Sequence, residues 1–227
     1  MSETRGKLIQ YLSQFVGDDR LALFGKILAY RTRYLTVVLE DIYQTQNASA
    51  VLRTCDCFGL QDIHIIENQN PFKVNYRVTL GSTKWLSLHR YNSPGNNTPS
   101  ALQGLKSDGY RIVATIPDPS AVTIHDFDLG KGKTALVFGS EKPGISSQVE
   151  SLADEFLTVP MFGFTESLNI SVSAAVIIHQ LITRLHNSDI AWQLTGDERE
   201  AVLLHWLRRQ IKRCDLLEKA FTQQARI

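Results

Sequence analysis

Cysteine is scarce in this sequence of 227 residues, and the three that occur are not arranged as a framework. Cys55, Cys57 and Cys214 form neither a C-x-x-C pair nor the regular ladder of a disulfide-rich domain. A fold held together by disulfide bonds is therefore excluded. The pattern is typical of a protein from a reducing compartment, and we expect the protein to be cytoplasmic.

Long apolar runs and an apolar amino terminus are also missing. The opening residues, MSETRGKLIQ, contain no signal core, and no apolar run is long enough to span a bilayer. We therefore expect no membrane association. An excess of one charge is lacking as well, since the net charge is only +1. Nucleic-acid binding depends on where the charges lie rather than on their sum, so this value excludes no partner.

What the sequence does contain is a series of short segments rich in β-branched and aromatic residues. They are continuously apolar and are separated by helical patterns. Alternation of this kind predicts an α/β fold built on a parallel sheet. The expected strands are 34–42, 62–68, 85–91, 110–116, 134–140 and 155–161.

Helical patterns fill the intervals and both ends of the chain. One helix is expected over 47–58, where a glycine follows, and another over 98–107, which opens with Thr-Pro. Residues 1–33 also have a helical pattern, and a capping-box spacing opens a helix over 195–226. The expected organisation is a helical arm at 1–33, an α/β domain at 34–188 and a helical extension at 189–227.

The segments that follow the strands are candidates for a site, because ligands of parallel α/β sheets bind at the carboxyl ends of the strands. The turn GSEKPG at 139–144 has the glycine spacing of a nucleotide phosphate loop, but Ile145 stands where such a loop needs lysine. No G-x-G-x-x-G occurs elsewhere. Nucleotide-binding classes are therefore disfavoured, and the turn fits either a different close-fitting ligand or a plain structural role.

A further segment changes abruptly from a polar turn to an apolar helix. In GFTESLNISVSAAVIIHQ, at 163–180, Ser167, Asn169 and Ser171 stand at the changeover. Such residues satisfy free backbone N–H groups where a helix begins, and capping alone explains one of them. Three at alternate positions also suit contact with a ligand. The following run is apolar on more than one face, which indicates burial in a dimer.

Asn47 and Arg53 lie six residues apart on the helix expected after the first strand. Taken alone, Arg53 is more typical of a surface salt bridge than of a site. The segments NASAVLRTCDCFG, ALVFGSEKPGIS and VPMFGFTESLNISVSAAVIIHQ, however, resemble the three motifs of the SpoU or TrmH family of RNA ribose 2′-O-methyltransferases in order and in spacing. The resemblance covers residues 34–188.

This resemblance implies a parallel-sheet fold of SPOUT type with a carboxy-terminal trefoil knot, S-adenosylmethionine as methyl donor, no metal, and a homodimer. The knot rests wholly on the family, because knots are almost absent from proteins in general. The positions that match the family's catalytic residues are Asn47, Arg53, Glu141, Ser167 and Asn169. The positions that match the lining of its donor pocket are Thr115, Gly139, Val159, Met161 and Leu168.

The substrate expectation follows from the same resemblance. Helical arms at both ends, without a separate amino-terminal RNA-binding domain, are similar to the TrmH branch, which modifies transfer RNA at guanosine 18 of the D-loop. Ribosomal RNA, or another nucleotide of transfer RNA, is the alternative substrate for the same chemistry. A non-catalytic RNA-binding module is a third interpretation.

The stretch WLRRQIKR at 206–213 predicts one basic helix face for RNA phosphates. The side chains expected there are Arg208, Arg209, Lys212 and Arg213, and Arg31 and Arg33 of the amino-terminal arm are expected to extend the surface. An ordinary solvated helix face fits this stretch equally well, because several acidic residues lie nearby.

Overall fold

The computed structural model describes residues 2–224, and the chain divides into two compact units. One unit spans Thr32–Trp192. The other combines the residues up to Arg31 with those from Gln193 onward. Residue 1 of the expected amino-terminal arm and residues 225–227 of the expected extension lie outside the described residues.

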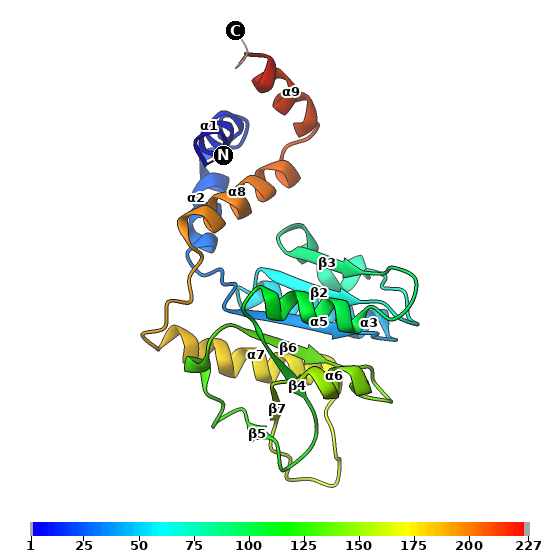
Figure 1. Cartoon of the computed structure of the whole chain (residues 1–227). Coiled ribbons are helices and arrows are strands. Elements are labelled where there is room, and N and C mark those ends of the chain that lie inside the picture. The colour runs from blue at the N-terminus through cyan, green and yellow to red at the C-terminus, as the bar shows by residue number, and fades with distance from the viewer. Residues whose placement is uncertain (1, 225–227) are drawn as a thin grey trace. The chain divides into compact units, whose positions relative to one another are not determined.

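The larger unit is built on a seven-stranded sheet in which every pair of neighbouring strands is parallel, so the α/β expectation is confirmed (Figure 1). The strand order is β3-β2-β1-β6-β4-β7-β5. The strands are β1 (Leu35–Glu40), β2 (Asp62–Ile66), β3 (Ser87–Tyr91), β4 (Arg111–Thr115), β5 (Val122–Thr123), β6 (Thr134–Phe138) and β7 (Glu155–Thr158). All residues of β1, β2 and β6 are buried, which explains why apolar residues in these strands are not confined to alternate positions.

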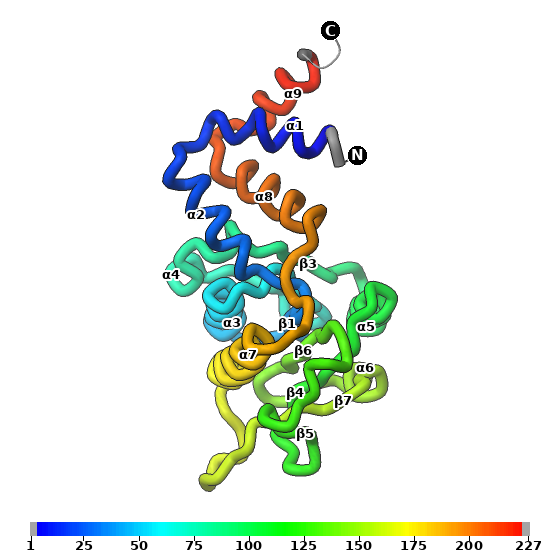
Figure 2. The backbone as a smooth tube through the Cα atoms, turned by 90° about the vertical axis from the view of Figure 1, so that its left-hand side faces the viewer, coloured from blue at the N-terminus to red at the C-terminus, as the bar shows by residue number. Residues whose placement is uncertain are grey.

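Helices cover both faces of this sheet. Helices α3 (Thr45–Cys57) and α7 (Ile170–His186) pack against each other on one face, where Val51 and Ile178 belong to the same core cluster. Helices α5 (Thr98–Ser107) and α6 (Ser147–Leu152) share a second core cluster. Figure 2 shows α3 and α7 on one side of the strands and α5 and α6 on the other. Shorter helical segments complete the unit, namely α4 (Tyr76–Thr79), η1 (Ser82–Lys84) and η2 (Leu129–Lys131).

The position of β1 determines where a ligand can bind. The chain proceeds from β1 outward through β2 to β3, whereas β6, on the other side of β1, belongs to the later half of the sheet. The loops that leave the carboxyl ends of β1 and β6 therefore diverge to opposite faces and leave a crevice between them. The loop at 139–146, which contains the GSEKPG turn, lies at this crevice.

The smaller unit consists of α1 (Ser2–Ser13), α2 (Asp18–Leu28), α8 (Gly196–Gln210) and α9 (Cys214–Gln224). The expected capping box is present, because the Thr195 hydroxyl accepts from the Glu198 N–H while the Glu198 carboxylate accepts from the Thr195 N–H. The expectation of one continuous helix over 195–226 is wrong. Helix α8 ends at Gln210, and Arg213 has a left-handed φ of 56°, which interrupts the helix before α9. Within residues 2–224, no helix is long and apolar enough to cross a bilayer.

Candidate functional site

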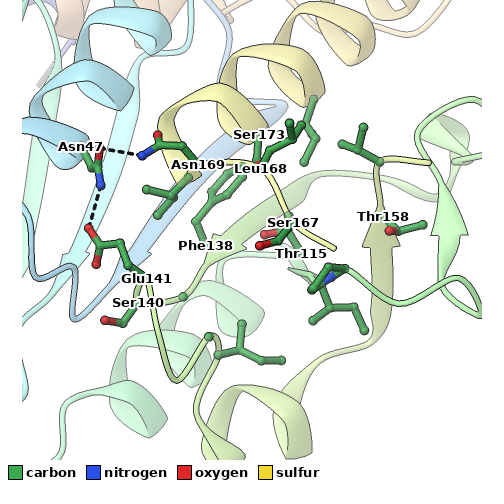
Figure 3. A pocket seen from close by; sticks show the side chains of 18 of the residues that line it. Asn47, Thr115, Phe138, Ser140, Glu141, Thr158, Ser167, Leu168, Asn169 and Ser173 are labelled. Atoms are coloured by element: carbon green, nitrogen blue, oxygen red, sulfur yellow. Dashed lines mark hydrogen bonds between the residues drawn. The ribbon is translucent and has the colours of Figure 1, made fainter. Parts of the chain in front are cut away.

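Three segments that are far apart in the sequence meet through a chain of hydrogen bonds between side chains. The Asn47 amide nitrogen, from the first turn of α3, donates to Oε1 of Glu141 over 2.9 Å. The Asn47 oxygen accepts from the amide nitrogen of Asn169 over 3.2 Å. Figure 3 shows the three side chains in this order at one edge of a cavity. The structure thus brings together one predicted catalytic residue from each of the three motifs.

Glu141 is held in its ionised form by donors. Burial alone raises the pKa of this carboxyl, but hydrogen bonds from the Asn47 side chain and from the backbone N–H groups of Gln44 and Tyr43 outweigh it, so the pKa is below the ordinary value of 4.5. An ionised carboxylate only accepts hydrogen bonds. Its geometry therefore suits fixing the amide of Asn47 and the 43–44 backbone rather than removing a proton.

The cavity beside this chain of hydrogen bonds has a volume of about 690 Å³. Its walls combine backbone turns, small hydroxyl side chains and apolar side chains, which is typical of a pocket for a small organic ligand. All five residues expected to contact a methyl donor line it, namely Thr115, Gly139, Val159, Met161 and Leu168. Ser167, Asn47, Glu141 and Asn169 line it as well.

Gly139 occupies a position where no other residue fits without movement. A β-carbon built on Gly139 would lie 2.3 Å from the carbonyl carbon of Gly144, which is far inside van der Waals contact. The cause is the tight turn between them, in which the Gly144 N–H donates to the Ser140 carbonyl over 3.0 Å. The glycine spacing in GSEKPG thus produces a turn that folds back against the end of β6 and forms part of the cavity wall.

Glu40, the last residue of β1, supports the same loop and was missed by the sequence reasoning. Its side chain is buried, with a residue exposure of 2%. Oε1 accepts from the hydroxyls of Thr98 and Ser146 over 2.6 Å each, and Oε2 accepts from the Ser146 N–H over 3.0 Å. Glu40 therefore ties the far end of the 139–146 loop to β1 and to the start of α5. An acid at the end of the apolar strand LTVVLE is the sequence feature that could have revealed it.

Asn169 is both a helix cap and a site residue. Its Oδ1 accepts from the backbone N–H of Ser171 over 2.9 Å and from the Ser171 hydroxyl over 2.6 Å, which caps α7. Its amide nitrogen remains available for Asn47. The two interpretations offered by the sequence are therefore compatible, since each uses a different end of the same amide group.

Arg53 does not reach the chain of hydrogen bonds. It is exposed on α3 and is not among the residues that line the cavity. The surface salt bridge that the sequence suggested for it is also not observed, because Arg53 makes no ion pair or side-chain hydrogen bond within the described part of the chain. Its catalytic role stays a prediction.

Two of the cations expected to bind RNA have other contacts in the structure. Arg31 is only 2% exposed, and its guanidinium carbon lies 5.3 Å from the centre of the Trp206 ring, so it packs the helical unit instead of facing solvent. Arg33 pairs with Asp62 over 2.6 Å. Burial and ion pairing, which the residue types alone do not reveal, remove these two side chains from a free basic surface.

The carboxy-terminal part of that surface also differs from the expectation. Arg208 pairs with Glu218 over 2.6 Å. Arg208 and Arg209 belong to the last turn of α8, whereas Lys212 and Arg213 lie in the connection to α9. The four exposed cations are therefore neighbours in sequence without sharing one face of a continuous helix.

Comparisons with known proteins agree with the motif assignment. A profile described as the SpoU rRNA Methylase family matches residues 34–179. A protein of Borreliella burgdorferi named tRNA (guanosine(18)-2′-O)-methyltransferase is 42% identical over 93% of this chain and 95% of its own length. The crystal structure of the A. aeolicus TrmH/SpoU tRNA modifying enzyme covers 86% of this chain and 98% of its own, with a TM-score of 0.74 and 28% identity.

One further solved structure shows only that the fold is shared. It is the SpoU methyltransferase AviRb from Streptomyces viridochromogenes in complex with the cofactor AdoMet. At 23% identity it covers 70% of this chain and 60% of its own, with a TM-score of 0.58.

Proposed function

Since this chain belongs to the SpoU family of RNA methylases, we propose that it transfers a methyl group from S-adenosylmethionine to the ribose 2′-hydroxyl of guanosine 18 in transfer RNA. The observation that carries the proposal is the chain of hydrogen bonds from Asn169 through Asn47 to Glu141, at the mouth of a cavity sized for a small ligand. The name of the Borreliella burgdorferi relative, which matches over nearly the full length of both chains, supports the choice of RNA and nucleotide.

The cavity fits the methyl donor by its chemistry. Adenine and methionine are recognised through backbone groups and apolar walls, and the backbone around Gly139 and the side chains of Val159 and Leu168 are of this kind. The bound donor would supply an electrophilic methyl group on a sulfonium. Ser167 and Thr115 both line the cavity and would hold the polar parts of the donor.

Arg53 would act on the RNA rather than on the donor. A guanidinium stays protonated near neutral pH, so it is a poor proton acceptor. Its planar fork instead suits a phosphate of the RNA, and its charge stabilises the alkoxide that develops as the 2′-hydroxyl loses its proton. Asn47 fixes the α3 turn that precedes Arg53 and helps to align hydroxyl and methyl group for attack.

The variant Arg53→Lys tests this role. Arg53→Ala, which removes both the charge and the guanidinium, is the reference for complete loss of the side chain's function. Lysine keeps the charge but loses the fork, so we expect methyl transfer to fall by about tenfold or more while calorimetric binding of S-adenosylmethionine is unchanged. Near-normal turnover by the lysine variant would show that guanidinium geometry is not required.

The homodimer is part of the proposal, and an apolar surface near α7 supports it. A second cavity of about 640 Å³ is lined by Phe58, Val176 and His179, among others. Phe162, which also lines this cavity, is 98% exposed, and Phe164, two residues further along the chain, is fully exposed. Large apolar side chains are rarely this exposed to solvent on the surface of a monomer. Phe162→Asp should shift sedimentation equilibrium toward the monomer, and an unchanged dimer would place the interface elsewhere.

Two other expectations remain parts of the proposal. The trefoil knot rests on membership of the family, and the cytoplasmic location rests on the cysteine usage, with Cys55, Cys57 and Cys214 all unbridged. Ribosomal RNA is the second candidate substrate, because the family that matches residues 34–179 is that of the SpoU rRNA methylases. Methylation assays with both RNAs separate the candidates, and donor binding without transfer to either RNA would favour a non-catalytic binding module.

A further inference from the structure

An unusual distribution of charge marks the segment that begins after β2 and runs through β3 to the end of α5. Residues 68–107 contain no aspartate or glutamate, although the whole chain has 23 acidic residues. Over the same stretch there are five cations, namely Lys73, Arg77, Lys84, Arg90 and Lys106. An excess of this kind creates a local positive potential that the net charge of the chain conceals.

Only some of these cations are neutralised by acids from elsewhere. Arg90 pairs with Glu67 over 2.7 Å, and Lys106 pairs with Asp154 over 2.7 Å. Lys73, Arg77 and Lys84 are exposed, and their side chains make no ion pair or hydrogen bond with any residue that the structure describes. Three free cations therefore remain within a short segment.

In the fold, this segment lies against α3, the helix that contains Arg53. Helices α4 and η1 both pack on α3, and Figure 2 shows α4 beside α3. The backbone N–H of Asn75 donates to the Ser49 hydroxyl over 2.9 Å, which fixes the start of α4 to α3 one helical turn before Arg53. Because Asn47 lines the donor cavity from the first turn of α3, the free cations lie along the same helix as the site.

Exposed aromatic rings accompany these charges. Tyr76, in α4, is 75% exposed, and Tyr43, in the loop before α3, is 74% exposed. Tyr43 is also next to the site, since its backbone N–H donates to Glu141 over 3.1 Å. Free cations interleaved with exposed rings suit unpaired RNA, in which phosphates need positive charge and bases need a stacking surface.

We propose that Lys73, Arg77 and Lys84, together with the ring of Tyr76, bind the RNA substrate beside the site. We call these four residues the α4 surface. The three cations contact phosphates and the ring of Tyr76 stacks on an unpaired base, so the α4 surface holds the strand against α3 while Arg53 acts at the target ribose. The identity of the RNA rests on the proposed function, whereas RNA binding by the α4 surface does not depend on it.

The test compares two double variants of the full-length protein. Lys73→Ala with Arg77→Ala removes two charges from the α4 surface. Lys131→Ala with Lys133→Ala removes two charges before β6, at the opposite, amino-terminal edge of the sheet. Binding of unmodified transfer RNA is measured by fluorescence anisotropy at several salt concentrations, together with calorimetric binding of S-adenosylmethionine as a check of folding.

We expect the first variant to raise the Kd for transfer RNA about tenfold at 0.15 M salt and to lower the slope of log Kd against log salt by about 1.5, as the loss of two phosphate contacts requires. The Lys131 and Lys133 variant should stay within about twofold of the unchanged protein. Equal effects of the two variants, an unchanged salt slope, or no RNA binding by the unchanged protein would overturn the α4 surface.

A second pair of variants isolates the ring. Tyr76→Phe keeps the stacking face and should bind RNA as tightly as the unchanged protein, whereas Tyr76→Ala should weaken binding about tenfold. Equal RNA affinity of the two variants would show that the ring of Tyr76 does not contribute to RNA binding. If the α4 variants lose RNA affinity but the unchanged protein methylates no transfer RNA, the surface stands and the proposed function fails.

Discussion

Asn47 and Glu141 are 94 residues apart in sequence, yet the amide of one donates to the carboxylate of the other over 2.9 Å. This bond joins the helix after β1 to the loop after β6, which are the two segments that border the crevice of the sheet. Asn169 extends it to the start of α7 over 3.2 Å. The position of α3 is therefore coupled to the loop that lines the cavity.

Asn47→Asp tests that coupling most simply. It removes the donor to Glu141 and places two carboxylates against each other, so one of them resists ionisation and the pKa of Glu141 rises from its lowered value. We expect methyl transfer at pH 7 to fall about tenfold or more, with partial recovery at lower pH, where one carboxyl is protonated and donates. Full activity at pH 7 would show that the bond is dispensable.

Gly139→Ala tests the tight turn. Its β-carbon must displace the Gly144 backbone, which would lie 2.3 Å away, so the turn that lines the cavity must change shape. We expect the Kd for S-adenosylmethionine to rise about tenfold or more by calorimetry. Gly104→Ala is the matched control, since that position lies in α5 with nothing within 4 Å of the new β-carbon. It should stabilise the protein by about 0.5–1 kcal/mol without affecting donor binding. Equal donor affinities in the two variants would contradict this account.

Glu40→Ala tests the support of the 139–146 loop. It leaves the Ser146 N–H and two hydroxyls without their buried acceptor, and we expect the free energy of unfolding to fall by about 2–4 kcal/mol and the KM for S-adenosylmethionine to rise. Glu67→Ala is the comparison, because that carboxylate is also buried but binds Arg90 and the Phe72 N–H instead. It should lower stability and leave that KM unchanged. A change in KM in both variants would indicate a general loss of stability.

His64 makes stability depend on pH in the weakly acidic range. Burial, and then repulsion from His89, whose ring stacks on it at 4.6 Å, lower the pKa of His64 from 6.5 to about 4. Between these values the unfolded chain binds a proton that the folded chain does not, so stability falls as the pH drops from 6.5 to 4. His64→Gln should remove up to about 3 kcal/mol of this loss, measured by urea unfolding at pH 7, 5 and 4. Parallel pH profiles for the two proteins would assign the loss to other groups.

The parallel sheet was predictable because its central strands are buried on both faces and leave a continuous apolar pattern in the sequence. Asn47, Glu141 and Asn169 were recognisable only through their motifs, since no local pattern places them within hydrogen-bonding distance. The support by Glu40 depends on contacts with Thr98 and Ser146, which are remote in sequence. The break at Arg213 was missed because a left-handed backbone at a non-glycine residue has no sequence signature. Strand β5 was missed because two residues are too few to show a pattern.

Methyl transfer to the ribose of guanosine 18 can be tested by mapping the position of a transferred label on RNA. The purified protein is incubated with labelled S-adenosylmethionine and, separately, with unmodified transfer RNA and ribosomal RNA, and Arg53→Ala serves as the control. We expect label on the ribose of guanosine 18 in the D-loop, and we expect no label with Arg53→Ala. Label on ribosomal RNA or on another nucleotide, or donor binding without any transfer, would contradict this expectation.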